Sequence, residues 1–469
     1  MNFHQLLLFL IFLKNSYAGT RVYFKQCAKN GFTCFTNSNK KVDIVYDCSK
    51  GVDDVIFFHN QFSAPSNIDS LKIQNCNTLS LATRCSGEMR PISKLEIYNI
   101  KNLIFQRLQY DSMLPPTVIF ENVSNIDSIP TKSFNQIIKS YYSVGCYVQP
   151  KDFQNVYFRN VTIDTIQSDA FVALNQFKNF SFIGVNIKRI QTHGIRLMQD
   201  FKGGFEMKNC VIDTLEYMAL QIYGKRTIFA DNHFSKISSS GINGTMEDFY
   251  FTDNFVETLY PLAFSILGTN IFILQNNFLY MKSSALESLS PGLIQDSGRN
   301  FGKLRFVYDF SKNTLSFTEA GSLHPDYVSY ENVQTEMMFS RNKILCSCDN
   351  LGWLFSPLGH GPNTAQIETF YEMVLDEAYG NECDHTCKLP VRVVEEMIEC
   401  GKCLSNVSLE YICDKNNKAT TAIAVGFNDS EIFVTREVLN PGNYTIGGSS
   451  KVELNVLDMF GVVLCWWLF

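Results

Sequence analysis

A histidine between two glycines is the segment of this sequence whose residue types most resemble a catalytic group. His360 stands between Gly359 and Gly361. A histidine can act as a general acid or base, but hydrolysis of a glycosidic bond also needs two carboxylates that meet at the scissile bond. The adjacent Asp53 and Asp54 lie far upstream. We therefore interpret His360 as a loop histidine.

Two short cysteine motifs contain residue types that bind zinc. They are Cys383-Asp-His385-Thr-Cys387 and Cys400-Gly-Lys-Cys403. Disulfides fit them better, because other features place the chain in an oxidising compartment. The sequence also lacks the short signatures of zinc proteases, serine hydrolases and phosphate-binding loops. We expect no catalytic residues, no metal site, no cofactor and no enzymatic activity.

A repeated pattern must position any binding residues. The segment VYFRNVTIDTIQSDAF starts at Val156, and further copies start 22 to 25 residues apart at Phe180, Phe205, Thr227, Phe249 and Ile271. The first and third positions of each copy are mostly apolar, which fits a short half-buried strand. A small residue follows at a fixed position in each copy: Ala170, Gly194, Ala219, Gly241, Ala263 and Ala285. One copy cannot bury its own apolar edge, so the copies are expected to stack as a solenoid.

The spacing of the apolar residues resembles that of the leucine-rich repeat. In that family a buried asparagine bonds the backbone of neighbouring turns, and this position holds Asn232, Asn254, Asn276 and Asn342. Val161, Val185 and Cys210 replace it elsewhere, so the match is divergent. The resemblance implies an α/β solenoid of parallel strands with short helices or coils. The alternative is a right-handed parallel β-helix, whose turns have a similar length.

The segment NKILCSCDNLGWL, residues 342–354, resembles the start of the cysteine-rich C-terminal cap of extracellular leucine-rich repeat proteins. The resemblance implies that Cys346 and Cys348 pair with cysteines from the set Cys383, Cys387, Cys400 and Cys403. Cys27, Cys34 and Cys48 precede the repeats and are disulfide candidates for an N-terminal cap. Cys210 is expected to be a buried thiol.

The sequence predicts passage through the secretory pathway. Residues 1–18 have the apolar run and small residues of a signal peptide. Seven Asn-x-Ser/Thr sequons are predicted glycosylation sites: Asn122, Asn160, Asn179, Asn243, Asn406, Asn428 and Asn443. In residues 447–469, small residues are followed by a spacer and a short apolar tail. This order matches a glycosylphosphatidylinositol (GPI) attachment signal. The alternatives for this tail are a last buried strand or an incomplete reading frame.

The predicted organisation has six segments. They are a signal peptide (1–18), an N-terminal cysteine-containing cap (19–70), the repeat solenoid (71–341), a cysteine-rich C-terminal cap (342–413), a glycosylated segment (414–446) and the GPI signal (447–469). A formal net charge of −6 over 469 residues argues against a nucleic-acid partner.

We expect a cell-surface or secreted recognition or adhesion protein that resembles arthropod adhesion proteins of this repeat class. Its partner would be a protein or a glycan, and its lipid anchor would insert in the outer membrane leaflet. The predicted binding residues alternate with the inward strand positions: Tyr157, Arg159, Ser181, Glu206, Lys208, Tyr250 and Thr252. The alternatives are a carbohydrate-active β-helix enzyme, which would need two carboxylates on one exposed face, and a structural matrix component.

Overall fold

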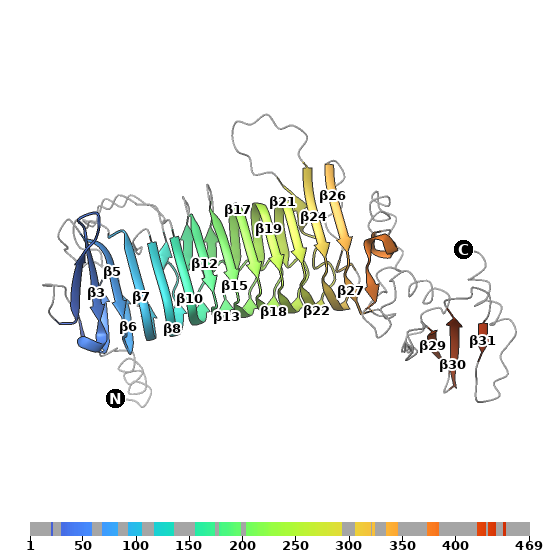
Figure 1. Ribbon diagram of the computed structural model, residues 1–469, viewed down its shortest axis with the longest axis horizontal. Coiled ribbons are helices and arrows are strands. Elements are labelled where there is room, and N and C mark those ends of the chain that lie inside the picture. The colour runs from blue at the N-terminus through green and yellow to red at the C-terminus, as the bar shows by residue number, and fades with distance from the viewer. Residues whose placement is uncertain are drawn as a thin grey trace, which may run out of the picture. The chain divides into compact units, whose positions relative to one another are not determined.

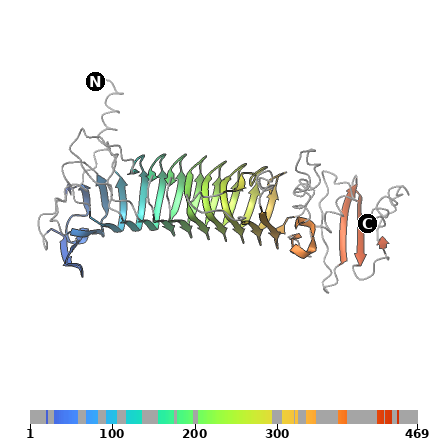
Figure 2. The ribbon, with the colours of Figure 1, turned by 90° about the horizontal axis from the view of Figure 1, so that it is seen from above.

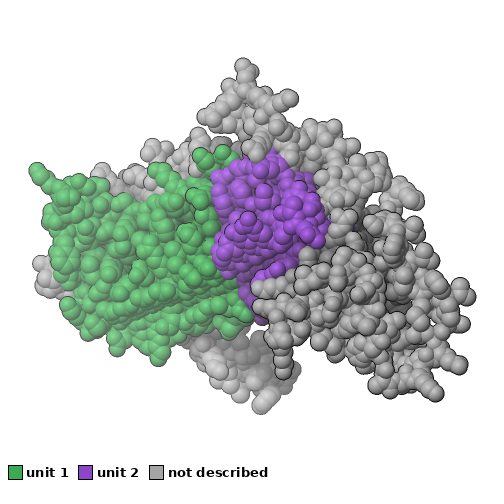
Figure 3. All heavy atoms as spheres, turned by 45° about the vertical axis from the view of Figure 1, so that its right-hand side comes forward, with its two compact units in different colours: residues 1–233, 240–247 green, residues 234–239, 248–469 purple. Residues whose placement is uncertain are grey.

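The computed structural model is a β-solenoid of mostly parallel strands (Figures 1 and 2). It describes residues 20–21, 30–58, 68–82, 92–105, 117–135, 155–173, 178–197, 203–292, 305–319, 321–323, 334–345, 373–383, 420–427, 430–437 and 444–446. The chain forms two compact units (Figure 3). Unit 1 comprises residues 1–233 and 240–247, and unit 2 comprises residues 234–239 and 248–469.

Successive coils of unit 1 pair through three parallel ladders. Ladder 1 contains β3 (Val42–Asp47), β5 (Ile68–Gln74), the first parts of β7 (Lys94–Phe105), β8 (Thr117–Ile129) and β10 (Asn155–Ile166), then β12 (Asn179–Ile183), β15 (Gly204–Lys208) and the end of β17 (Leu220–Ala230). Ladder 2 contains β4 (Asp54–Phe58), β6 (Thr78–Ala82), the second parts of β7, β8 and β10, then β13 (Asn186–Ile190) and β16 (Val211–Leu215). Ladder 3 contains β9 (Phe134–Asn135), β11 (Phe171–Ala173), β14 (Ile195–Leu197) and the start of β17.

Unit 2 has the same three ladders. Ladder 1 contains the end of β21 (Phe264–Leu274), β24 (Arg305–Ser311) and β26 (Gln334–Ser340). Ladder 2 contains β20 (Phe255–Leu259), β22 (Asn277–Met281), β25 (Thr314–Thr318), β27 (Lys343–Ile344) and β28 (Glu382–Cys383). Ladder 3 contains the start of β21 and β23 (Leu289–Pro291). Strands β18 (His233–Ile237) and β19 (Ile242–Thr252) each contain residues of both units.

The remaining elements are short or antiparallel. In unit 1, β1 (Thr20–Arg21) pairs with β4, β2 (Phe32–Thr36) runs antiparallel to β3, and η1 (Cys48–Lys50) follows β3. In unit 2, η3 (Glu377–Tyr379) precedes β28. Strands β29 (Thr420–Phe427), β30 (Ser430–Glu437) and β31 (Tyr444–Ile446) form a separate antiparallel sheet.

Inward side chains of equivalent position stack from coil to coil. Phe120, Phe158 and Phe182 are fully buried, and their successive ring centroids lie 4.6 and 5.0 Å apart with nearly parallel planes. In unit 2, Phe310 and Phe339 stack in the same way at 5.2 Å. Alternating apolar residues therefore build the core by repeating one contact along each ladder.

A buried row of asparagines satisfies backbone groups inside unit 2. The row contains Asn254, Asn276, Asn313, Asn342 and Asn381. The Oδ1 of Asn313 accepts the backbone N–H of Asn276 at 2.8 Å, and the same pattern recurs from coil to coil. In unit 1, Asn232 bonds the backbone N–H of Cys210 at 2.9 Å. Three of these unit 2 asparagines and Asn232 match the position predicted from sequence, whereas Asn313 and Asn381 were not predicted.

Residues with positive φ lie at the corners between ladders 1 and 2 and between ladders 2 and 3. Between ladders 2 and 3 of unit 1, Asp169, His193 and Met218 have φ of 54°, 59° and 50°. The next residue is the small one of the repeat, and it is buried. At Gly194 an added Cβ would lie 2.8 Å from the Cγ2 of Ile190. The small residue is therefore needed because the turn brings the backbone against a core side chain.

The predicted solenoid of parallel strands is confirmed. Helix is rare in the described residues, which contain η1, η3 and one helical turn at 373–375. Most complete coils have three strands, an arrangement that matches the alternative, a parallel β-helix, more closely than strands backed by helices. The parallel ladders also begin at β3, within the segment that the sequence predicts as the N-terminal cap.

Candidate interaction surface

The outward side of ladder 1 in unit 1 carries five of the predicted binding residues. The first outward row contains, on successive coils, Tyr157, Ser181 and Glu206. The second row, two residues further along each strand, contains Arg159, Ile183 and Lys208. Neighbouring strands lie about 4.8 Å apart. The fold therefore brings residues far apart in sequence into one patch, here called the strand face.

Opposite charges alternate on the strand face. Arg159 lies 3.7 Å from the carboxylate of Glu121 on the preceding coil, and its guanidinium is 5.2 Å from the ring centre of Tyr157. Lys208 pairs with Glu206 at 2.6 Å. These side chains are partly exposed, and exposed pairs contribute little to stability because water screens them. The patch is locally neutral, and its charged groups are accessible to a partner.

The strand face extends over earlier coils that the sequence shows only as degenerate copies. The ammonium of Lys72 lies 4.4 Å from the ring centre of Tyr98, and Lys94 pairs with Glu96 at 2.5 Å. The segments LKIQN from Leu71 and KLEIYN from Lys94 carry these residues at the outward positions of their strands. Outward alternation in those copies was the signal that could have identified them.

Ser181 differs from its neighbours on the strand face. It is only 5% exposed, and its Oγ has no hydrogen-bond partner. The small side chain stands between Tyr157 and Glu206 in the first row. The prediction that Ser181 binds a partner therefore concerns a side chain that is covered.

In unit 2 the outward side of ladder 1 carries the other two predicted residues, Tyr250 and Thr252. Tyr250 stacks on Phe272 with ring centroids 5.0 Å apart and an interplanar angle of 13°. Asp309 pairs in register with Phe272, and burial raises the pKa of this carboxyl, although a hydrogen bond from Ser311 opposes the shift. Both predicted residues are half-buried.

A second aromatic pair lies on the outward side of ladder 2 in unit 2. Tyr280 and Phe317 stand in register with ring centroids 5.5 Å apart, and they are 38% and 44% exposed. Lys282 lies over the ring of Tyr280 and pairs with Glu319 at 2.6 Å. These residues were not predicted, because they fall between the apolar positions of the repeat that we interpret as core.

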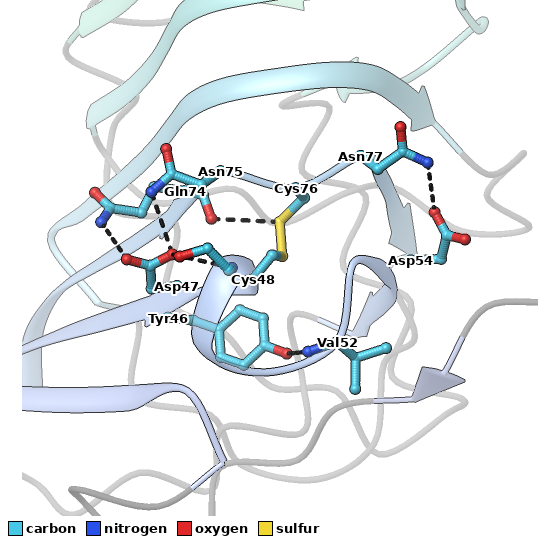
Figure 4. The surroundings of a disulfide bond; sticks show 10 residues. Tyr46, Asp47, Cys48, Val52, Asp54, Gln74, Asn75, Cys76 and Asn77 are labelled. Atoms are coloured by element: carbon cyan, nitrogen blue, oxygen red, sulfur yellow. Dashed lines mark hydrogen bonds between the residues drawn. A yellow bond between two sulfur atoms is a disulfide. The ribbon is translucent and has the colours of Figure 1, made fainter.

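A disulfide joins Cys48 to Cys76 on adjacent coils of unit 1 (Figure 4). The two cysteines follow Asp47 and Asn75, at the same corner that carries buried asparagines in unit 2. Burial would raise the pKa of Asp47, but hydrogen bonds from Ser49, Gln74 and Asn75 outweigh it and lower the pKa to about 2. The sequence identified Cys48 as a disulfide candidate but not its partner.

The other cysteines for which the sequence makes a prediction here fall into three groups. Cys34 and Cys383 are disulfide-bonded, as predicted. Cys210 is a buried thiol, also as predicted, and burial raises its pKa to about 11 despite hydrogen bonds to backbone groups that lower it. The remaining disulfide candidates lie outside the described residues: Cys27, Cys346, Cys348, Cys387, Cys400 and Cys403.

Four predicted glycosylation sites are described. Asn160 and Asn179 are exposed, whereas Asn122 and Asn243 are half-buried. The other three, Asn406, Asn428 and Asn443, lie outside the described residues, as do His360, the signal peptide and the GPI signal. Among the described residues there is no group of three metal-binding side chains, and none of their helices is long and apolar enough to cross a membrane.

No family model, curated protein or solved structure matches this chain. The strand face is the feature of the described residues that best indicates a function for the protein.

Proposed function

We propose that this protein is an extracellular recognition or adhesion protein that binds a protein or glycan partner through the strand face. The observation that carries the proposal is the alignment of Tyr157 and Arg159 on one coil with Glu206 and Lys208 two coils further along, on the same outward rows. Tyrosine and arginine are enriched at protein interfaces, and a flat parallel ladder presents them without rearrangement. The proposal places the protein at the cell surface, held by a GPI anchor, or in the medium.

Disulfides support the extracellular location. Cys48 and Cys76 are bonded, and Cys34 and Cys383 are bonded too. Stable disulfides are rare in reducing compartments. The strand face also has no excess of one charge near its centre, since Arg159 and Lys208 are each matched by a glutamate. A partner with a mixed or neutral surface therefore fits it better than a polyanion.

The test measures binding of the purified, fluorescently labelled full chain to a panel of cultured cell types by flow cytometry. Tyr157→Ala and Lys208→Glu should each weaken binding by about tenfold or more, as loss of an interface anchor does. The matched control is Lys188→Glu on ladder 2, because Lys188 is also exposed and paired with a carboxylate, Asp164 at 2.7 Å.

Unchanged binding of both strand-face variants would contradict the proposal. Equal loss in the control would contradict it too, since the effect would then be one of net charge. Absence of binding to every cell type would count against a recognition role.

A further inference from the structure

Two rows of hydrogen-bonded side chains, exposed or half-buried, border the strand face in unit 1. The first lies at the corner between ladders 1 and 2 and contains Asn75, Asn99, Asn122 and Asn160, all with φ between 52° and 60°. The Nδ2 groups of Asn99, Asn122 and Asn160 each donate to the Oδ1 of the asparagine on the preceding coil, at 3.3, 3.1 and 3.2 Å in turn. Asparagine tolerates this left-handed backbone conformation better than most residues.

The second row lies at the start of the ladder 1 strands. Asn155 donates to the Oγ1 of Thr117 at 3.3 Å, and Asn179 donates to the Oδ1 of Asn155 at 2.8 Å. The three residues stand in register on successive coils. Both rows are thus continuous chains of side-chain hydrogen bonds along the coils.

Each row ends at a sequon asparagine that faces a glycine. The coil after Asn160 has Gly184 at the equivalent corner, and a Cβ there would lie 2.8 Å from the Oδ1 of Asn160. The coil after Asn179 has Gly204 in register. Asn122, by contrast, lies between two other asparagine side chains. Asn160 and Asn179 therefore have room on one side that Asn122 lacks.

The direction of the hydrogen bonds determines which amide hydrogen remains available. The Oδ1 and Nδ2 of Asn122 bond neighbours on opposite coils, so Nδ2 uses the hydrogen that points away from its own carbonyl. The same holds for Asn160, whose Oδ1 faces Gly184 and whose Nδ2 bonds Asn122. The second hydrogen on Nδ2 takes no part in the row.

Oligosaccharide transfer replaces that second hydrogen. The bond between the anomeric carbon and a lipid diphosphate carrier breaks, a bond from Nδ2 to the anomeric carbon forms, Nδ2 loses one proton and the lipid diphosphate leaves. The hydrogen bond of the row can remain in the product. Coils lie about 4.8 Å apart, however, which leaves no room for a sugar ring on an asparagine whose side chain is bonded to the row on both sides, or for two sugars at the same position of neighbouring coils.

We propose that Asn160 and Asn179 carry N-linked oligosaccharides in the secreted protein and that Asn122 does not. Transfer acts on the unfolded chain, so folding selects the molecules whose sugars fit, and chains with a sugar on Asn122 are retained in the cell. The two sugars lie near opposite ends of the ladder 1 strands and confine a partner to the surface between them, around Tyr157 and Arg159. This inference rests on the secretory passage in the proposed function.

The experiment expresses the full chain in secretory cells and measures sequon occupancy in the secreted protein by glycopeptide mass spectrometry. Asn160 and Asn179 should be occupied in most molecules, and Asn122 in several-fold fewer. Asn122 is followed by Val-Ser, whereas Asn160 is followed by Val-Thr. The variant Ser124→Thr gives both sites the same Asn-Val-Thr sequon. Low occupancy of Asn122 should persist in this variant.

A second variant tests the role of the glycine. Gly184→Asn keeps a residue type that accepts the φ of +64° but extends the row past Asn160, so occupancy of Asn160 in the secreted protein should fall several-fold. Equal occupancy of Asn122 and Asn160 in Ser124→Thr would overturn the inference while leaving secretion intact. Absence of sugar from every sequon would instead remove the secretory premise of the proposed function, and the inference with it.

Discussion

The Nδ2 of Asn313 donates to the backbone carbonyl of Ile273 on the preceding coil at 2.9 Å. Its Oδ1 at the same time accepts the backbone N–H of Asn276 at 2.8 Å. The buried side chain of Asn313 thus pairs with one backbone N–H and one backbone carbonyl at the corner of the coil. Unit 2 repeats this solution with a buried asparagine at the same corner of neighbouring coils.

Asn313→Leu should destabilise unit 2 by about 2–4 kcal/mol, because it leaves a buried N–H and a buried carbonyl without partners. Urea denaturation of the purified chain measures the change. Asn277→Ala is the matched control, since Asn277 is exposed on the adjacent strand. Similar losses in both variants would show that the buried row has no special role.

Cys210 should resist alkylation in the folded protein. Burial raises its pKa to about 11, and only the thiolate reacts. Iodoacetamide at pH 8 should label Cys210 only after denaturant unfolds unit 1, and peptide mass spectrometry follows the label. Rapid labelling under native conditions would contradict the buried position of this thiol.

Asp47 should make stability depend on acid pH. Its folded pKa of about 2 lies below the unfolded value of about 3.9, so its contribution is present above that value and is lost as the pH falls toward 2. Asp47→Asn should lower the free energy of unfolding by about 2 kcal/mol at pH 7 and flatten its decline between pH 5 and pH 2. Asp53→Asn removes an exposed carboxylate of the same unit and controls for the loss of one negative charge. A wild-type decline in Asp47→Asn would contradict the role of Asp47.

Phosphatidylinositol-specific phospholipase should release the protein from intact cells that express the full chain. The expectation follows from the order of small residues, spacer and apolar tail in residues 447–469. An antibody against the solenoid would detect the protein in the medium. Retention on treated cells would count against the lipid anchor, and appearance in the medium without treatment would indicate a secreted protein.

The repeat could be predicted because apolar alternation and a small corner residue recur at nearly constant spacing. Coils that contain insertions broke this register. Asn276 and Asn313 are 37 residues apart, and Asn342 and Asn381 are 39 apart, so neither Asn313 nor Asn381 falls at the expected interval. The corner position became visible only when backbone pairing aligned the coils.

Only part of the strand face was predicted, because the prediction relied on regular copies of the repeat. Tyr157 and Glu206 follow from alternation within regular copies, whereas Tyr98 lies in a degenerate copy whose outward positions were not selected. The pairing of Cys48 with Cys76 was also out of reach, because sequence fixes no disulfide connectivity. The burial of Ser181 depends on side chains from neighbouring coils, and no single strand specifies it.

A glycan placed on the strand face shows directly whether this surface binds the partner. Glu206→Asn with Lys208→Thr creates a sequon on the outward side of β15, and Val211→Asn with Asp213→Thr creates one on the exposed side of β16 in the same coil. Mass spectrometry confirms occupancy before binding to cells is measured. We predict that the sugar on β15 abolishes binding while the sugar on β16 leaves it intact. Full binding with an occupied sequon on β15 would contradict recognition through the strand face.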